Sequence, residues 1–264
     1  TFWLAIYNGL EQFKTIVLVQ LVSSVLVFIV TISLIYCHSI DGAIWAIALS
    51  ELLMVLATFV FVVKDKRFFQ FNFRFLIKKE YLIAIQKFSA MALLSAIIVP
   101  LTLLLIRNNI TAGYSLPEAG LWEATTKLSS FYMHFFNAGL SLYYMPKLAS
   151  LQTESEFKQE LMGYFSTFVP LFLIMLLVLF FVKEWVLELI FTTEFLKIKS
   201  VLIWQFIGDF FKIITLAFGY QILVKARLKV YFFLEIAFNV SYLLLSFFWI
   251  KTQGYEGAIQ AYCC

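Results

Sequence analysis

The sequence predicts an all-α, polytopic membrane helix bundle, and three of its properties point to that class. Hydrophobic residues make up 62% of its 264 residues, against about 45–50% in soluble domains. Charged residues make up only 14%, which is too few to cover the surface of a soluble protein. The apolar residues gather in runs of roughly 20, the length that crosses a bilayer as a helix.

The predicted spans are helices because a membrane helix satisfies its own backbone hydrogen bonds, whereas an open strand does not. Asp41-Gly-Ala opens the second span. Partial spans stand at both ends, 1–10 and 256–264, without an initiator Met or a signal peptide, so we expect part of a longer protein. The seven complete spans are 14–37, 41–63, 86–107, 118–145, 160–182, 198–223 and 229–250.

Lysine and arginine are distributed unevenly between the two ends of these spans. With residues 11–14 placed in the cytoplasm, thirteen of the twenty basic residues fall in cytoplasmic segments and five on the opposite side. A bias of this kind sets the orientation of membrane proteins. It also accounts for the net charge of +4, so we expect no nucleic-acid partner.

The longest polar connection, 64–85, divides the chain. It alternates Phe with polar residues from 69 to 75, and beside a membrane this pattern fits a segment lying in the headgroup interface. We expect 1–63 to be the end of an N-terminal transmembrane lobe and 64–85 a cytoplasmic interfacial linker. Residues 86–264 would form a truncated C-terminal transmembrane lobe.

The fourth predicted span carries a stripe of polar side chains. Alternating intervals of four and three residues give the 3.6-residue period of an α-helix, so all members share one face. Ionisable groups cost about 2.5–3.5 kcal/mol each at the centre of a membrane helix, so they usually face a bundle interior or water. We therefore expect an aqueous cavity along Glu123, Lys127, Ser130, His134, Asn137 and Ser141.

The sixth span repeats this pattern more sparsely. Gln205, Asp209 and Lys212 stand at i, i+4 and i+7 and share one face. Glu51 in the second span and Glu235 near the start of the seventh are further intramembrane candidates.

Simpler explanations stay open for single members of both sets. Glu123 with Lys127, and Asp209 with Lys212, have spacings at which opposite charges neutralise each other within a helix. His134 on its own also fits an interhelical hydrogen bond.

Motifs for catalysis and metal binding are absent from the sequence. It contains no phosphate-binding P-loop, no HExxH, no GxSxG and no paired His and Cys ligands. Cys37, Cys263 and Cys264 give neither a disulfide framework nor a metal site. We expect no enzymatic activity, no cofactor and no metal.

Several segments, taken in order, resemble one family of bacterial transporters. They include Gln86-Lys-Phe-Ser-Ala-Met-Ala-Leu93, Gly120-Leu-Trp-Glu-Ala-Thr-Thr-Lys-Leu-Ser-Ser130, Trp204-Gln-Phe-Ile-Gly-Asp-Phe-Phe-Lys212 and Ala226-Arg-Leu-Lys-Val-Tyr231. Their order and spacing are similar to those of the O-antigen translocases and lipid III flippases, within the multidrug/oligosaccharidyl-lipid/polysaccharide (MOP) exporter superfamily. The similarity covers about 85–262 and is looser over 1–63.

The resemblance implies a two-lobed, twelve-helix bundle that alternates between inward- and outward-facing states. It implies transport of an undecaprenyl-pyrophosphate-linked oligosaccharide from the cytoplasmic to the periplasmic leaflet of the bacterial inner membrane. The implied partners are this lipid-linked substrate, membrane lipids, and the polysaccharide polymerase with its chain-length machinery.

The resemblance also gives site residues, since the polar motif of the sixth span matches the family. Arg107 falls on the family's Ile/Met-Arg position, although snorkelling at the outer boundary explains an Arg there as well. Glu123 and Lys127 depart from the family, which commonly has neutral residues at both positions. Glu51 and Asp209 are candidates for ion coupling. The predicted translocation cavity comprises Arg107, Trp122, Glu123, Lys127, His134, Asn137, Gln205, Asp209 and Lys212.

Two other interpretations remain. The intramembrane carboxylates favour a MATE-like, cation-coupled drug antiporter of the same superfamily. The incomplete ends favour a membrane fragment that transports nothing on its own.

Overall fold

The computed structural model describes residues 2–9, 12–65, 79–151 and 153–264, and every regular element in these ranges is a helix. Five of these helices are long and apolar enough to cross a membrane. The prediction of an all-α membrane helix bundle is therefore confirmed. The chain divides into two compact units, Thr1–Leu76 and Ile77–Cys264, here called unit 1 and unit 2.

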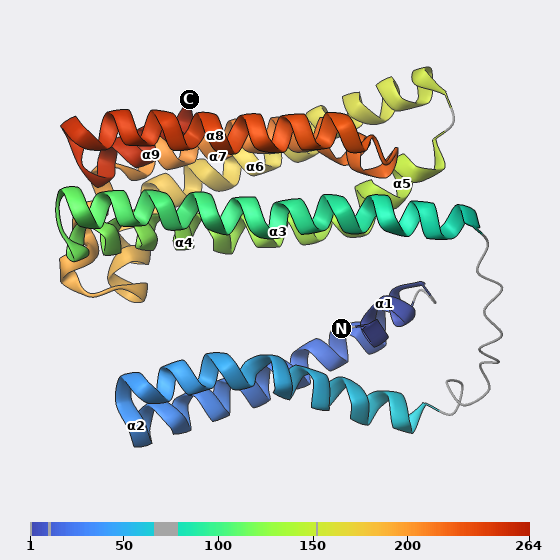
Figure 1. The fold of residues 1–264 in the computed structure, drawn as a ribbon, viewed down its shortest axis with the longest axis horizontal. Coiled ribbons are helices and arrows are strands. Elements are labelled where there is room, and N and C mark those ends of the chain that lie inside the picture. Colours follow the sequence, from blue (N-terminus) through green and yellow to red (C-terminus); the bar gives the residue numbers. More distant parts are fainter. Residues whose placement is uncertain (1, 10–11, 66–78, 152) are drawn as a thin grey trace. The chain divides into compact units, whose positions relative to one another are not determined.

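Unit 1 is a helical hairpin preceded by a short helix (Figure 1). Helix α1 spans Phe2–Gly9, and the hairpin is the long element α2, Phe13–Lys64, whose backbone leaves helical geometry at Ser39 (φ 50°, ψ −123°). The predicted spans 14–37 and 41–63 thus form its two arms. Most of α2 is apolar on all sides, as expected of a helix whose solvent is lipid.

The predicted linker 64–85 lies only partly within the described residues. Positions 66–78, which include the alternating Phe segment 69–75, fall outside the described residues. Its last residues, 79–85, are already helical because α3 begins at Lys79.

Unit 2 contains the remaining helices. A π-helical turn, Leu140–Tyr144, joins α4 to α5, and a 3₁₀-helix, Thr193–Ser200, leads into α7. The α-helices are α3 Lys79–Gly113, α4 Leu116–Gly139, α5 Met145–Ser150, α6 Glu154–Ile190, α7 Leu202–Val224, α8 Leu228–Gln253 and α9 Tyr255–Cys263.

Two helix starts in unit 2 follow local capping chemistry. The Ser115 hydroxyl accepts a hydrogen bond from the Glu118 backbone N–H at 3.3 Å, which caps α4. At α6, Thr153 and Glu156 form a reciprocal capping box, with Thr153 accepting from the Glu156 N–H and Glu156 accepting from the Thr153 N–H, both at 3.2 Å.

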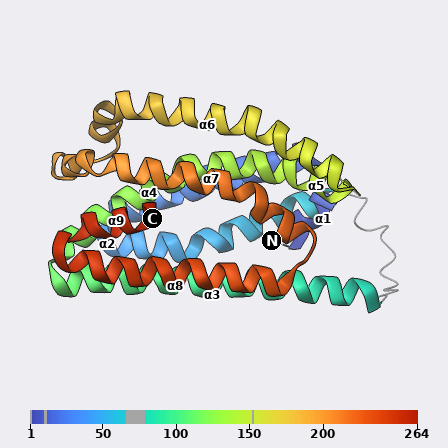
Figure 2. The same ribbon diagram turned by 90° about the horizontal axis from the view of Figure 1, so that it is seen from above.

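Within unit 2 the long helices run alongside one another (Figures 1 and 2). Helix α3 packs against α8, and α6 packs against α7. The short α9 turns back from α8 and contacts α8, α7 and α4. Although α9 has only 9 residues, its Ala258 and Ile259 are 0% and 1% exposed, so it lies inside the bundle.

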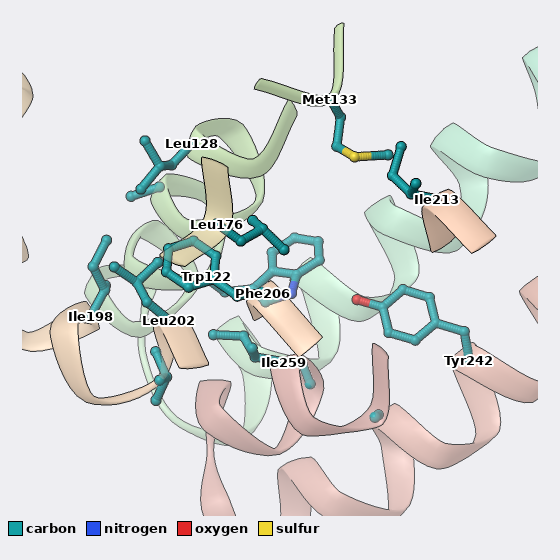
Figure 3. Packing of buried hydrophobic residues seen from close by; sticks show 14 of the residues in the cluster. Trp122, Leu128, Met133, Leu176, Ile198, Leu202, Phe206, Ile213, Tyr242 and Ile259 are labelled. Carbon is teal, nitrogen blue, oxygen red and sulfur yellow. The ribbon is translucent and has the colours of Figure 1, made fainter. Parts of the chain in front are cut away.

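The core of unit 2 forms where α4, α6, α7 and α9 meet. Figure 3 shows Trp122 of α4 packed beside Phe206 of α7 and Leu176 of α6, with the hydroxyl of Tyr242 of α8 pointing toward them. Outward-facing apolar residues such as Phe181 and Phe248 are 80% and 69% exposed. Such surfaces suit contact with lipid rather than with water.

The predicted span 118–145 is a helix in the structure, and the helical path continues past 145 to the end of α5 at Ser150. It is not among the five helices that qualify as membrane-crossing by length and hydropathy. The polar stripe that sequence analysis placed on this span accounts for its lower hydropathy. Its position beside α3, α7 and α9 keeps it within the bundle.

Candidate functional site

The polar stripe of α4 lies mostly on the surface of unit 2. Lys127, Ser130 and His134 are exposed, whereas the flanking positions Trp122 and Leu128 are buried. The His134 ring Nδ1 lies 3.1 Å from the Ser130 backbone oxygen, one turn earlier on the same stripe. The helix therefore presents its polar groups outward while its apolar residues hold it in the bundle.

An ion pair ties one end of the stripe to α3. The Arg107 Nε lies 3.1 Å from a carboxylate oxygen of Glu123, with side chains 44% and 33% exposed. The carboxylate of Glu123 thus pairs between helices, and not with Lys127 on its own helix. Lys127 has no ion pair within the described part of the chain, so its charge is available to a ligand.

Asn137 adds an acceptor further along the stripe. Its side chain is half-buried, and its Oδ1 atom is buried without a hydrogen-bond partner among the described residues. Buried polar atoms are normally satisfied, so an isolated acceptor of this kind is a place where a ligand or an ordered water is expected to bind.

Asp209 occupies a different environment, the interior of unit 2, where it is 0% exposed. The Ser129 hydroxyl donates to its carboxylate at 2.7 Å and the Tyr132 hydroxyl donates to the same oxygen. Gln205 donates at 3.3 Å and the Tyr262 hydroxyl donates to the other oxygen at 2.7 Å. Donors from α4, α7 and α9 therefore converge on one buried carboxylate, which offsets the cost of its burial.

Gly208 makes room for one of these donors. A Cβ atom at this position would lie 2.6 Å from the Tyr262 ring and 3.3 Å from the Cys263 Cα. The missing side chain thus lets α9 approach α7 closely enough for Tyr262 to reach Asp209. This contact links residues 53 positions apart in the sequence.

Lys212 does not pair with Asp209, although the two are three residues apart. Lys212 is exposed, and its amine lies 5.6 Å from the centre of the Tyr262 ring, within the range of a cation–π contact. The tyrosine thus contacts the carboxylate with its hydroxyl and the lysine with its face. Asp209 and Lys212 therefore do not neutralise each other as a pair, because each contacts other groups.

The structure separates the predicted site residues into two groups. Trp122, Gln205 and Asp209 are packed inside unit 2, with exposed fractions of 2%, 3% and 0%. Trp122 in particular has no face open for stacking on a sugar. Glu51 belongs to unit 1 and is exposed on α2. The exposed or half-buried group comprises Arg107, Glu123, Lys127, His134, Asn137 and Lys212.

Sequence reasoning did not connect Asp209 with Ser129 or Tyr262. Ser129 stands one position off the polar stripe, so helical periodicity assigned it to the apolar face. Tyr262 lies in a segment that looked like an incomplete span. A signal for Tyr262 was Gly208 next to Asp209, since a small residue beside a buried carboxylate allows another helix to approach closely.

Metal binding has no support in the described part of the chain. No group of three or more His, Cys, Asp or Glu side chains gathers there. The hydroxyl and amide groups around Asp209 all donate to its carboxylate.

Comparison with known proteins places this architecture in a family. Residues 5–200 match the family model described as polysaccharide biosynthesis protein. The lipid III flippase of Escherichia coli (strain K12) is 26% identical over 178 residues, which are 67% of this chain and 43% of that protein. The lipid III flippase of Shigella flexneri gives the same values. No solved structure matches.

The chain thus spans less than half the length of the curated relatives it matches. Those relatives are flippases, which are transporters and not enzymes. The predicted resemblance to the lipid III flippase family is confirmed. Five of its helices are long and apolar enough to cross a membrane, and the match over most of the sequence shows that this chain belongs to the polysaccharide biosynthesis protein family.

Proposed function

We propose that this chain is part of a flippase for a lipid-linked oligosaccharide in the bacterial inner membrane. The complete protein would carry an undecaprenyl-pyrophosphate-linked repeat unit from the cytoplasmic to the periplasmic leaflet by alternating access. The observation that supports this most is the outward-facing polar stripe of α4, in a chain whose other long helices are apolar.

The chemistry of the stripe suits such a substrate. A pyrophosphate and its sugars cannot cross hydrocarbon unaided, because removing charge and hydroxyl groups from water is prohibitively costly. Lys127, which has no ion pair within the described residues, offers a cation for phosphate, and the His134 ring offers a nitrogen for sugar hydroxyls. Asn137 offers an acceptor, and so does Ser130, whose hydroxyl donates to the Thr126 backbone oxygen at 2.8 Å. The prenyl chain would remain in lipid while the headgroup follows the stripe.

Asp209 and Glu51 remain proposals for ion coupling, with different support. Every oxygen of Asp209 already accepts hydrogen bonds from within unit 2, so the geometry favours a role in holding α4, α7 and α9 together. Glu51 is exposed on α2 and keeps its acceptor capacity. We propose Glu51 as the better coupling candidate, and the polymerase and chain-length machinery as partners of the complete protein.

The test is complementation of a flippase-deficient bacterium with the complete protein, scored as surface polysaccharide at equal expression. We expect restoration, and a drop on the order of tenfold for Lys127→Ala, because a hydrogen bond to a charged group contributes about 1.5–3 kcal/mol. Lys158→Ala is the matched control, since Lys158 is also exposed but lies at the start of α6. Unchanged export in Lys127→Ala would remove the stripe from the proposed path.

The carboxylates in the spans support a second candidate, the cation-coupled drug antiporter. It predicts raised resistance to cationic compounds and no change in surface polysaccharide. The same strains distinguish the two functions, because a flippase restores polysaccharide without conferring resistance.

A further inference from the structure

A basic groove lies at one end of unit 2 and is lined by none of the residues of the α4 stripe. It has a volume of about 490 Å³ and is open to the outside, within the range of roughly 300–1,000 Å³ typical of small-molecule sites. The C-terminal part of α6, the 3₁₀-helix and the start of α7 form its walls. The lining residues are Phe180, Lys183, Leu196, Lys197, Lys199, Ser200 and Ile203.

Two of its three lysines form no ion pair within the described residues. Lys199 forms an ion pair with Glu184, so its charge is compensated. Lys183 is half-buried, with its amine 4.0 Å from the centre of the Phe180 ring, and Lys197 is exposed. Neither amine forms an ion pair within the described residues, although Glu184, the partner of Lys199, also interacts electrostatically with Lys183. The groove therefore carries a net positive charge beside aromatic and aliphatic walls.

The apolar wall continues along α6 into the membrane. Leu177 and Leu173 precede Phe180 by three and seven residues, so all three lie on one face of the helix. Leu177 is 50% exposed and Leu173 is 41% exposed, and α6 is one of the helices able to cross a membrane. A hydrocarbon chain lying on this face would lead directly to the lysines at the end of the helix.

We propose that this groove binds an anionic phospholipid at the membrane interface. Its phosphate would contact Lys183 and Lys197, and an acyl chain would lie along Leu177 and Leu173. The Ser200 hydroxyl donates to the Lys197 backbone oxygen at 3.2 Å, so it would offer an acceptor to a headgroup hydroxyl. A free phosphate ion would use only the lysines and leave the apolar walls of Leu196 and Ile203 without a role. This site is independent of the flippase proposal, since it uses none of the residues of the α4 stripe.

The experiment measures lipid binding to the full chain, purified in detergent, by native mass spectrometry. The probes are dioleoyl phosphatidylglycerol, dioleoyl phosphatidylcholine and inorganic phosphate. We expect phosphatidylglycerol to bind more tightly than phosphatidylcholine, and the double variant Lys183→Gln with Lys197→Gln to weaken it on the order of tenfold. The control pair, Lys158→Gln with Lys251→Gln, removes the same charge at exposed positions outside the groove and should leave binding unchanged.

A single reversal keeps the test valid even if the double variant folds poorly. Lys197 is exposed, so Lys197→Glu should leave the fold intact and still weaken phosphatidylglycerol binding. Equal weakening by the control pair would show nonspecific charge attraction and overturn the proposal. Displacement of the lipid by millimolar inorganic phosphate would also overturn it, because the site would then recognise phosphate alone.

Discussion

The turn within α2 and the turn between α8 and α9 have nearly the same backbone but opposite surroundings. Ser39 opens one turn with φ 50° and ψ −123°, and Gly254 opens the other with φ 61° and ψ −141°. Three residues after Ser39 and after Gly254, both turns have the sequence Gly-Ala-Ile, which Asp41 precedes in the first turn and Glu256 in the second. In both, a Cβ on the glycine would collide with the carbonyl oxygen eight residues earlier.

What differs is the packing of the helix that follows. Ile44, after the first turn, is 62% exposed, whereas the equivalent Ile259 is 1% exposed. Three residues further on, the first helix has Ile47, which is 74% exposed, and the second has Tyr262, whose hydroxyl donates to Asp209. The turn is set by short-range sterics, whereas the burial of the second helix depends on which neighbours surround it.

The largest expected effect comes from adding a methyl group to the second turn. We expect Gly257→Ala to lower the free energy of unfolding by about 3 kcal/mol, because the collision moves a helix packed on several sides. Gly42→Ala should cost less, about 1 kcal/mol, since the residues that follow this turn, such as Ile44 and Ile47, are largely exposed and lose less packing when the helix shifts. SDS-induced unfolding in mixed micelles measures both values.

Gly163→Ala is the control, since a Cβ there meets nothing within 4 Å. It should stabilise α6 slightly, because Ala is the better helix former. If Gly42→Ala and Gly257→Ala cost the same, local geometry would set the penalty and packing would add nothing.

Tyr262 distinguishes the two turns chemically, because only the second turn is followed by a donor to Asp209. We expect Tyr262→Phe to cost about 2 kcal/mol, because it removes a hydrogen bond to a buried carboxylate and keeps the ring. Tyr114→Phe is the matched control, because its hydroxyl donates to the Lys251 backbone oxygen at 3.3 Å in an exposed position. A loss as large in the control would contradict a special contribution of the Asp209 cluster.

The smallest effects are expected from exchanging the first residues of the turns. A side chain at the positive φ of Gly254 is strained, so Gly254→Ser should cost about 1 kcal/mol. Ser39→Gly relieves the same strain and should stabilise unit 1 by less than that, because glycine also gains freedom in the unfolded chain. Melting temperatures of the two variants should therefore move in opposite directions, and a shared direction would show that the turns are not equivalent.

The sequence predicted most of the helices, because hydrophobic runs and helical periodicity are local properties. The stripe of α4 was recognised for the same reason, since its intervals follow one helix. The Asp209 cluster was not, because its donors come from three helices and one of them lies 53 residues away. Spacing along a chain shows which face a residue shares, but it does not show that Trp122 and Asp209 face the bundle core while Lys127 faces outward.

The π-helical turn Leu140–Tyr144 changes the phase of everything that follows it. Each residue of an α-helix advances by about 100°, and the wider turn delays the later residues by roughly one such step. In an unbroken α-helix Leu148 would share the direction of the polar stripe, but it is 4% exposed in the structure. The preceding residue, Lys147, reaches Glu160 of α6 at 2.6 Å, and this hydrogen bond raises the pKa of its amine. Because the turn acts as a one-residue insertion, deleting one of its residues should give an unbroken α-helix in which Leu148 stays buried and Lys147 still reaches Glu160.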